Sequence, residues 1–349
     1  MKAAVIYGEK DVRIEEFEVA EVTPGKVKVK VAWTGICGSD LHAYHHGLGV
    51  AYEEHPISQR KVPLVLGHEF AGTVEEVGEG VSHVAVGDKV AIEPVLYCGQ
   101  CEFCRKGDYN LCEVSNVGFL GLSSDGGFAE YAVADAKYFH KLPDNVSLEE
   151  GALVEPTAVA FHAVKKSGLK FGDSAAVFGA GPIGLLLLLC AQAAGAAETF
   201  VIDISQERLD KAKELGATYT INPKDEDAAE KIMAITGKGV EVAFEAAGAQ
   251  PTFTAALASL KKKGTLLVVA GFSQNITIDP NSLLFKEAKI EFTLAYANDF
   301  PPVIKAISEG KLDVKKVITK QIKLDNLVEE GLELLTQDKS QAKILVSPN

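Results

Sequence analysis

Hydrophobic and polar residues alternate with a period of two along the first third of the chain. The clearest runs are Lys26–Val31 and Gly72–Val77, and turn-forming glycines recur at Gly78, Gly80 and Gly87. Successive side chains of a strand point to opposite faces of a sheet, so this period predicts half-buried strands. We expect the first third to fold as a compact, barrel-like β unit.

After about Pro156 the pattern changes to apolar runs separated by amphipathic segments. Helices are predicted at Gln206–Leu215 and Ala228–Thr236. Strands are predicted at Ser174–Gly179, Thr199–Asp203, Thr218–Ile221, Val240–Ala246, Thr265–Ala270 and Lys289–Leu294. Strands that alternate with helices predict an α/β fold with a doubly wound parallel sheet.

The C-terminal segment is expected to return to the first domain. It has helical character from Ala295 and ends on a predicted strand, Ala342–Val346. The expected organisation is therefore a first domain at residues 1–156, a second at 157–294, and a segment at 295–349 that returns to the first domain. The 349 residues are enough for two domains.

Composition narrows the possible partners. The net charge is -13, from 35 basic and 48 acidic residues, and such a surface repels nucleic acid and anionic membranes. One uncharged stretch, 174–197, has the hydropathy of a membrane span, but Gly179, Gly181, Pro182 and Gly184 interrupt it, which indicates a buried strand followed by a buried helix. The Lys261–Lys263 run is expected to be a solvated helix end.

The stretch Gly179-Ala180-Gly181-Pro182-Ile183-Gly184 follows one predicted strand and begins a leucine-rich helix. In this context a GxGxxG motif predicts a dinucleotide site, because the glycines let the pyrophosphate approach the helix N-terminus. Asp203 ends the next strand, where a carboxylate binds the ribose hydroxyls of NAD and repels the extra phosphate of NADP. Arg208 nearby either tolerates that phosphate or covers the adenine.

Four of the six cysteines are concentrated in one short segment, with the spacing Cys98-x2-Cys101-x2-Cys104-x7-Cys112. Four thiolates at this spacing can enclose one tetrahedral zinc ion, and a closed set of four ligands predicts a structural site. An iron–sulfur cluster and buried free thiols are the alternatives. The N-terminus shows no export signal, so metal binding in the cytoplasm is favoured over disulfides.

A second set of potential ligands is scattered along the chain: Cys37, His68, Glu69 and Glu155. A catalytic zinc ion uses few protein ligands of these types and keeps one exchangeable position. Sequence spacing alone does not bring the four residues together, and each also fits an ordinary structural role.

The segment Gly67-His68-Glu69-x2-Gly72-x5-Gly78-x2-Val81, with the cysteine segment and the later dinucleotide unit, resembles the zinc-containing medium-chain alcohol dehydrogenases along essentially the whole chain. Within that family it is most similar to the butanediol dehydrogenases. The resemblance implies a GroES-like β domain, a Rossmann domain and an active site in the cleft between them. It also implies NAD-linked oxidation of a small secondary alcohol such as 2,3-butanediol, and a homodimer or homotetramer.

By the same resemblance, Cys37 and His68 hold a catalytic zinc ion together with either Glu69 or Glu155, and Ser39 passes the alcohol proton towards His42. Phe119 is expected to line the substrate pocket. Gly38 stands where some relatives carry an arginine that grips the pyrophosphate. Sorbitol or another polyol and L-threonine are alternative substrates, and a non-catalytic NAD(H)-binding protein is the alternative of another class. His45, His46 and His55 are expected to be solvated loop residues without a chemical role.

Overall fold

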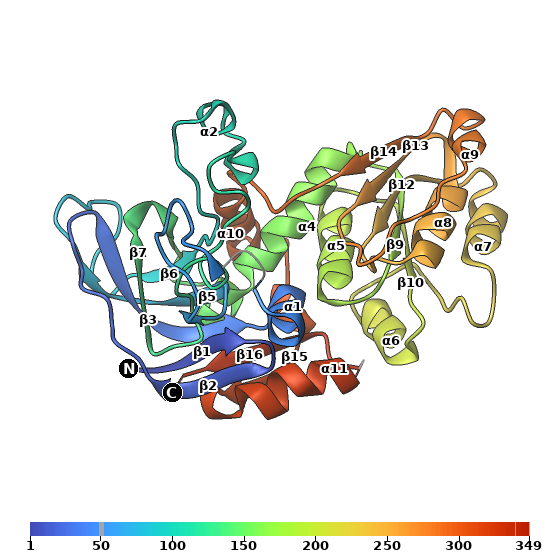
Figure 1. The fold of residues 1–349 in the computed structure, drawn as a ribbon. Coiled ribbons are helices and arrows are strands. Elements are labelled where there is room, and N and C mark those ends of the chain that lie inside the picture. The colour runs from blue at the N-terminus through green and yellow to red at the C-terminus, as the bar shows by residue number, and fades with distance from the viewer. Residues whose placement is uncertain (49–51, 339, 349) are drawn as a thin grey trace. The chain divides into compact units, whose positions relative to one another are not determined.

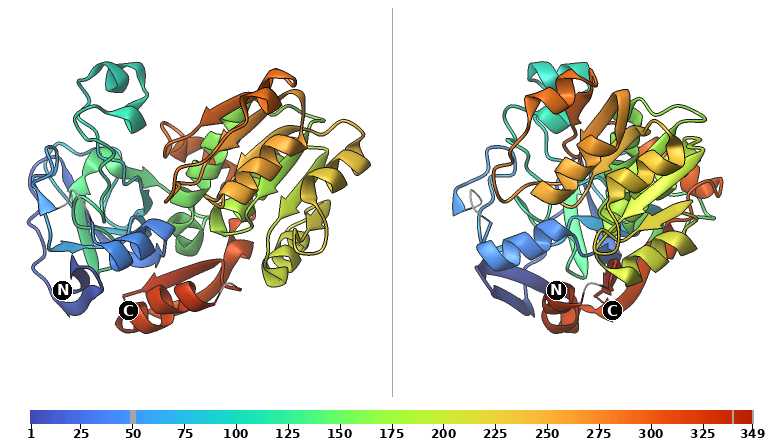
Figure 2. Two further views of the ribbon diagram at one scale, coloured as in Figure 1. Left: turned by 45° about the vertical axis from the view of Figure 1, so that its right-hand side comes forward. Right: turned by 90° about the vertical axis from the view of Figure 1, so that its right-hand side faces the viewer.

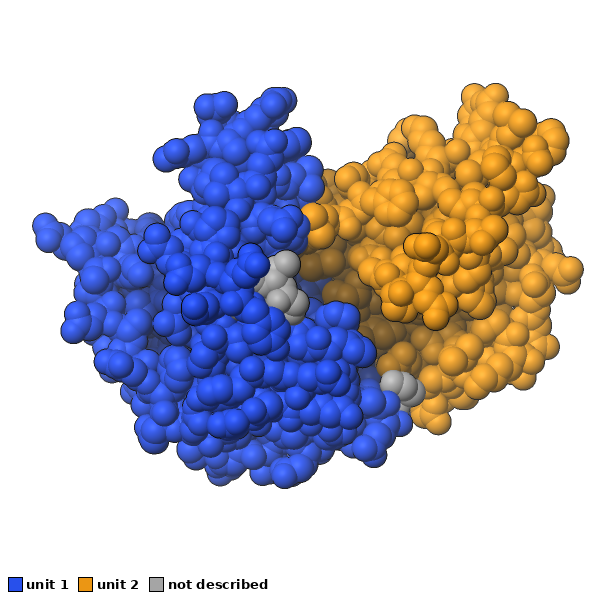
Figure 3. All heavy atoms as spheres, viewed as in Figure 1, with its two compact units in different colours: residues 1–156, 297–310, 318–349 blue, residues 157–296, 311–317 orange. Residues whose placement is uncertain are grey.

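The computed structural model describes residues 1–48, 52–338 and 340–348 (Figure 1). The chain forms two compact units, which Figure 3 distinguishes by colour. Unit 1 comprises Met1–Pro156, Ala297–Gly310 and Ile318–Asn349, and unit 2 comprises Thr157–Tyr296 and Lys311–Val317. Each unit has its own sheet framework.

Unit 1 is built on two sheets. The larger has the order β15-β16-β3-β5-β6-β8, with β7 also paired to β3, and the smaller has the order β2-β1-β4. Val27, Val29 and Val31 are fully buried in the larger sheet while the lysines between them are at least partly exposed, which confirms the predicted period of two. The strands are β1 (Lys2–Gly8), β2 (Asp11–Glu16), β3 (Lys26–Gly35), β4 (Leu64–Val65), β5 (Glu69–Val77), β6 (Lys89–Ile92), β7 (Tyr131–Asp135), β8 (Phe139–Lys141), β15 (Ile318–Lys323) and β16 (Lys343–Ser347).

The strand expected near the C-terminus is found as β16, which pairs antiparallel with β3. At the end of β3, Gly35 lies opposite Leu345 of β16 and also opposite Glu69 of β5. Strand β16 and the start of β5 therefore flank the same end of β3, where Lys343 of β16 contacts Glu69 of β5.

Unit 1 also contains short helices: α1 (Gly38–His46), α2 (Glu102–Lys106), α3 (Leu148–Ala152), α10 (Phe300–Ser308) and α11 (Leu334–Gln337). The longer helix α4 (Val154–Ser167) begins in this unit. The interpretation of His45 and His46 as loop residues is wrong, because both lie in the last turn of α1. His55 is half-buried, and its Nε2 atom lies 2.9 Å from the carbonyl oxygen of Ser115.

Unit 2 contains one sheet of six parallel strands in the order β11-β10-β9-β12-β13-β14. The predicted strands are all present, as β9 (Ser174–Phe178), β10 (Glu198–Ile202), β11 (Tyr219–Ile221), β12 (Val240–Glu245), β13 (Leu260–Val268) and β14 (Lys289–Phe292). The strand order reverses direction beside β9, and open α/β sheets bind ligands at such a switch point. The α/β class and the doubly wound topology are confirmed.

Helices cover this sheet on both faces (Figures 1 and 2). They are α5 (Pro182–Ala193), α6 (Gln206–Glu214), α7 (Ala228–Thr236), α8 (Gln250–Ser259) and α9 (Pro280–Leu284). Helix α5 is apolar because it is buried: Leu185–Leu188 have no exposed surface. No helix in the described residues is long and apolar enough to cross a membrane. The Lys261–Lys263 run belongs to β13 and not to a helix end, since α8 stops at Ser259 and β13 begins at Leu260.

Candidate metal centres and dinucleotide-binding loop

The four clustered cysteines meet in a loop of unit 1. Their sulfur atoms all lie within 4.8 Å of one another, and Cys98 Sγ is 3.9 Å from Cys104 Sγ. None of the six cysteines of the chain is in a disulfide. Helix α2, which starts right after Cys101, turns the chain back so that Cys104 faces the first cysteines. The loop therefore offers four thiol ligands around one point, which fits a tetrahedral zinc ion.

Backbone amides of the loop point at these sulfur atoms. The N–H groups of Gln100 and Cys101 donate to Cys98 Sγ at 3.3 Å and lower the pKa of Cys98 to about 6. Burial, by contrast, raises the pKa of Cys104 to about 12. Four thiolates this close repel one another, so a bound cation is what allows all of them to ionise.

A second cluster is formed by residues far apart in sequence. Ligand atoms of Cys37, His68 and Glu69 lie within 4.8 Å of one another. Cys37 occupies the N-cap position of α1, two residues after β3 ends, and His68 directly precedes β5. Because β3 and β5 pair with Gly35 opposite Glu69, the end of one strand meets the start of the other. The sheet register thus brings the three residues together.

Asp40 is a residue of this cluster's surroundings that the sequence analysis missed. Its carboxylate is fully buried; Oδ2 accepts a hydrogen bond of 2.8 Å from the Cys37 backbone N–H, and Oδ1 lies 3.6 Å from His68 Nδ1. Neither Asp40 Oδ1 nor His68 Nδ1 has a hydrogen-bond partner in the described part of the chain. A metal-binding histidine commonly directs its other ring N–H at a carboxylate, so this pair fits a cation bound at Nε2.

The charges around His68 also fit a cation. Burial alone would lower the pKa of His68, but Asp40 and Cys37 raise it well above its usual value. Ser39 Oγ lies 3.3 Å from His68 Nε2, on the side that faces away from Asp40. The imidazole is thus placed between a carboxylate and a thiol, where positive charge is favourable.

Lys343 is the second residue that the sequence analysis missed. Its Nζ lies 2.7 and 2.6 Å from the two carboxylate oxygens of Glu69 and donates a third hydrogen bond of 3.0 Å to the Ile36 carbonyl. Lys343 is 1% exposed and Glu69 is fully buried. Burial would lower the pKa of Lys343, but the charges of Glu69, Cys37 and Glu155 raise it, so the ammonium form is favoured. The sequence signal that could have revealed this residue is a lysine at the start of the apolar C-terminal strand β16.

The remaining predicted residues lie on neighbouring elements. Glu155 is buried in the first turn of α4, and its negative charge helps to raise the pKa of Lys343. His42 is exposed on α1, one helical turn after Gly38. The ring of Phe119 lies 6.1 Å from that of His68, centroid to centroid, which places it beside the cluster.

In unit 2 the GxGxxG segment connects β9 to α5. Gly179 has a φ of +105°, and a Cβ atom on Gly184 would lie 1.7 Å from the Gly179 carbonyl oxygen, so the loop and the helix pack too closely for side chains. Gly181, in contrast, has no atom near its missing Cβ and is the N-cap of α5 without a side-chain cap. Pro182 occupies the first turn and Ile183 follows it. This open helix N-terminus fits the pyrophosphate of a dinucleotide.

Asp203 follows β10 and bonds back to this loop. Its Oδ2 accepts a hydrogen bond of 2.7 Å from the backbone N–H of Ala180, and its Oδ1 accepts one of 2.9 Å from Ser205. Arg208 Nη1 lies 3.8 Å from Asp203 Oδ2. The carboxylate therefore anchors the glycine loop.

Family comparisons agree with this arrangement. The family model described as "Alcohol dehydrogenase GroES-like domain" matches residues 23–144, and that described as "Zinc-binding dehydrogenase" matches residues 182–309. The chain belongs to the zinc-binding alcohol dehydrogenase family. It is therefore an oxidoreductase whose cofactors are zinc and a nicotinamide dinucleotide.

Relatives of this dehydrogenase match it over its whole length. The (R,R)-butanediol dehydrogenase of Bacillus subtilis (strain 168) is 45% identical over 352 residues, covering all of both chains. The crystal structure of 2R,3R-butanediol dehydrogenase from Bacillus subtilis superposes with a TM-score of 0.94 at 45% identity, over 100% of this chain and 99% of that one. A sorbitol dehydrogenase of Bacillus subtilis (strain 168) is 38% identical over 100% of this chain and 98% of its own length.

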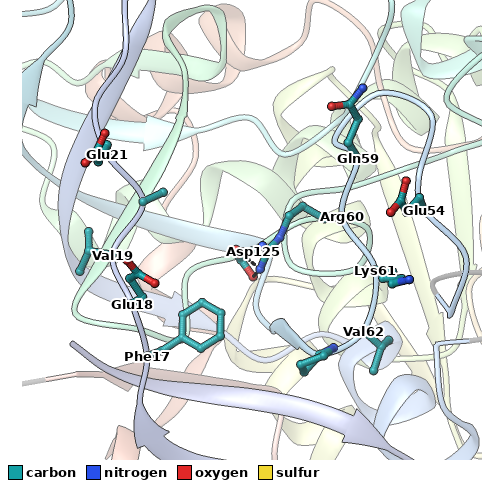
Figure 4. A pocket seen from close by; sticks show the side chains of 12 residues that line it. Phe17, Glu18, Val19, Glu21, Glu54, Gln59, Arg60, Lys61, Val62 and Asp125 are labelled. Carbon is teal, nitrogen blue, oxygen red and sulfur yellow. Dashed lines mark hydrogen bonds and ion pairs between the residues drawn. The ribbon is translucent and has the colours of Figure 1, made fainter.

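A separate pocket of about 640 Å³ also lies in unit 1 of the dehydrogenase (Figure 4). An ion pair of 2.9 Å joins Arg60 to Asp125 on its wall. None of its lining residues belongs to the two cysteine-containing clusters.

Proposed function

We propose that this dehydrogenase interconverts 2,3-butanediol and acetoin with NAD(H), using Cys37 and His68 to hold its catalytic zinc ion. The observation that carries the metal assignment is the meeting of Cys37, His68 and Glu69 within 4.8 Å. The diol is supported by the full-length identity of 45% to an (R,R)-butanediol dehydrogenase.

When bound, zinc supplies Lewis acidity that lowers the pKa of the substrate hydroxyl, and NAD accepts the hydride. The protein contributes orientation and a path for the proton. Asp40 positions both ligands in this proposal: its Oδ2 accepts a hydrogen bond from the Cys37 backbone N–H, and its Oδ1 faces His68 Nδ1 at 3.6 Å. Ser39 accepts the hydroxyl proton as it passes its own proton on, and that proton reaches solvent through exposed His42.

We assign the resting third ligand to Glu155 and the role of exchanging ligand to Glu69. Both oxygens of Glu69 are bonded to Lys343, so a metal ion would compete with an ammonium group for that carboxylate. Zinc content separates the two roles: Glu155→Gln is expected to lower occupancy of the catalytic site more than Glu69→Gln. Lower occupancy in Glu69→Gln than in Glu155→Gln would reverse the assignment, and equal occupancy would contradict it.

For the cofactor we propose a preference for NAD over NADP, supported by Asp203 after β10 and by the open helix end at Gly181. The expected effect of Asp203→Ser is a smaller ratio of kcat/KM for NAD to that for NADP. Because Asp203 also anchors the loop through Ala180, the ratio is the proper measure and not the activity alone. An unchanged ratio would contradict the ribose role.

The decisive experiment combines metal analysis with a substrate panel on the purified protein. We expect two zinc ions per chain and the highest kcat/KM with 2,3-butanediol among diols, sorbitol and L-threonine. Comparable turnover of sorbitol, which the 38% identity to a sorbitol dehydrogenase makes the second choice, would contradict the diol assignment. Absence of turnover with NADH binding retained would favour a non-catalytic NAD(H)-binding protein.

We further propose a cytoplasmic homodimer or homotetramer. The cytoplasm is supported by six free cysteines, four of them poised for metal binding. The oligomer is supported by β14, an edge strand of the unit 2 sheet, near which apolar side chains are exposed: Leu284 at 67%, Phe285 at 76% and Phe292 at 60%. Light scattering on the purified protein tests it, and a monomer at micromolar concentration would contradict it.

A further inference from the structure

Helix α1 carries a pair of histidines outside the two clusters already described. His42 and His46 are four residues apart, and their ring centroids are 4.9 Å apart with an interplanar angle of 50°. Both side chains are exposed. Residues four apart share one face of a helix, so the two imidazoles point into solvent side by side.

The third histidine of this helix has a different environment. His45 is only partly exposed, its Nε2 lies 3.0 Å from Thr336 Oγ1, and its ring packs edge-on against Tyr44 at 5.0 Å. It therefore faces the protein while His42 and His46 face outward. This makes His45 a matched control on the same helix.

We propose that His42 and His46 form a chelating pair for a late first-row divalent cation such as Ni²⁺ or Zn²⁺, distinct from the two zinc sites. Two histidines at positions i and i+4 of a helix present their nitrogens to one ion. Neutral imidazole is a preferred ligand of these metals, with water completing the coordination. The pair also includes the last residue of α1, where the carbonyl end of the helix dipole favours positive charge.

A metal ion bound to this pair is expected to inhibit turnover, an expectation that rests on the proposed function. A metal ion on His42 occupies the nitrogen lone pair that receives the proton in the relay from Ser39. An excess of free Ni²⁺ or Zn²⁺ therefore inhibits the dehydrogenase without displacing the catalytic zinc ion. Binding of the extra ion, in contrast, depends only on the geometry of α1.

Calorimetric titration of the zinc-replete enzyme with Ni²⁺ tests the site. One additional ion per chain is expected to bind, with both zinc ions retained by metal analysis. His46→Ala is expected to weaken this binding at least about tenfold, since one imidazole remains, whereas His45→Ala leaves it unchanged. Equal affinity in the parent enzyme and the His46→Ala variant would overturn the site.

Inhibition is measured separately. His46→Ala is expected to keep the basal activity and to need at least about tenfold more Ni²⁺ for half inhibition, while His45→Ala behaves as the parent enzyme. If His46→Ala loses the ion but is inhibited as before, the link to the relay is overturned and the binding site stands. If the His42→Gln variant loses the ion but keeps full activity, the relay in the proposed function fails and the binding site is unaffected.

Discussion

The two cysteine-containing clusters of this protein hold their ligands in opposite ways. In the cysteine loop all four ligands lie between Cys98 and Cys112, and a single turn of helix brings them together. In the other cluster Cys37 and His68 come from different strand ends and meet only because β3 pairs with β5. The first cluster is a property of a short segment, and the second is a property of the folded sheet.

The groups around the two clusters also differ in being local in one case and distant in sequence in the other. The loop sulfurs are stabilised by backbone amides of the loop itself, as at Cys98. The cluster of Cys37, His68 and Glu69, called here the dispersed cluster, is surrounded by charged side chains from other elements, namely Asp40 in α1 and Lys343 in β16. We therefore expect damage to the loop to reduce mainly stability and damage to the dispersed cluster to reduce mainly activity.

The strongest test is Cys37→Ser. Loss of this proposed ligand of the catalytic zinc ion removes several kcal/mol of charge stabilisation, so kcat/KM should fall at least about 10³-fold. Metal analysis should show one zinc ion instead of two, with NADH binding retained. Cys190→Ala is the matched control, because this buried thiol belongs to neither cluster. Activity that survives Cys37→Ser would contradict the dispersed zinc site.

Lys343→Met probes the charge balance of the dispersed cluster. It leaves the fully buried Glu69 carboxylate without its cation, and breaking a buried pair in this way costs about 3–5 kcal/mol. Urea denaturation measures the loss in the free energy of unfolding. The Glu69→Gln/Lys343→Met double variant should recover part of it, whereas additive losses would mean that the ion pair is not the cause.

Cys98→Ser is the counterpart in the loop. Removing one ligand of the proposed structural zinc site should destabilise unit 1 and lower its Tm by about 4–8 °C. The catalytic zinc ion should remain, as should most of the activity at low temperature. Gln100→Ala is the control, because it keeps the backbone amide that donates to Cys98. Complete inactivation with an unchanged Tm would contradict the expectation that the cysteine loop supports mainly stability.

Asp40→Asn should have the smallest effect. Asparagine still accepts the bond from the Cys37 amide but lacks the negative charge that faces His68, so zinc affinity of the dispersed cluster should fall about tenfold. Competition with a chelator measures this loss, and the zinc ion of the cysteine loop serves as an internal reference. Equal weakening of both sites would indicate a general destabilisation.

The strands, the glycine loop and the cysteine loop could be predicted because each depends on a local sequence pattern. The alternation in Lys26–Val31 and the apolar runs after Pro156 encode strands directly, because strand and helix periods follow from backbone geometry. The GxGxxG segment and the cysteine spacing place all their functional atoms within a few residues of one another. Where the pattern is ambiguous the prediction fails, as for Lys261–Lys263, which lies in β13 and not at a helix end.

The sequence by itself determined the sheet framework, the glycine loop and the four-cysteine loop, because each depends on neighbours in the chain. Only the tertiary structure decided that Cys37, His68 and Glu69 share one site and that Asp40 and Lys343 support it. The physical reason is strand register: pairing of β16 and β5 with β3 sets which distant side chains meet, and a register shifted by one residue would turn them to the other face.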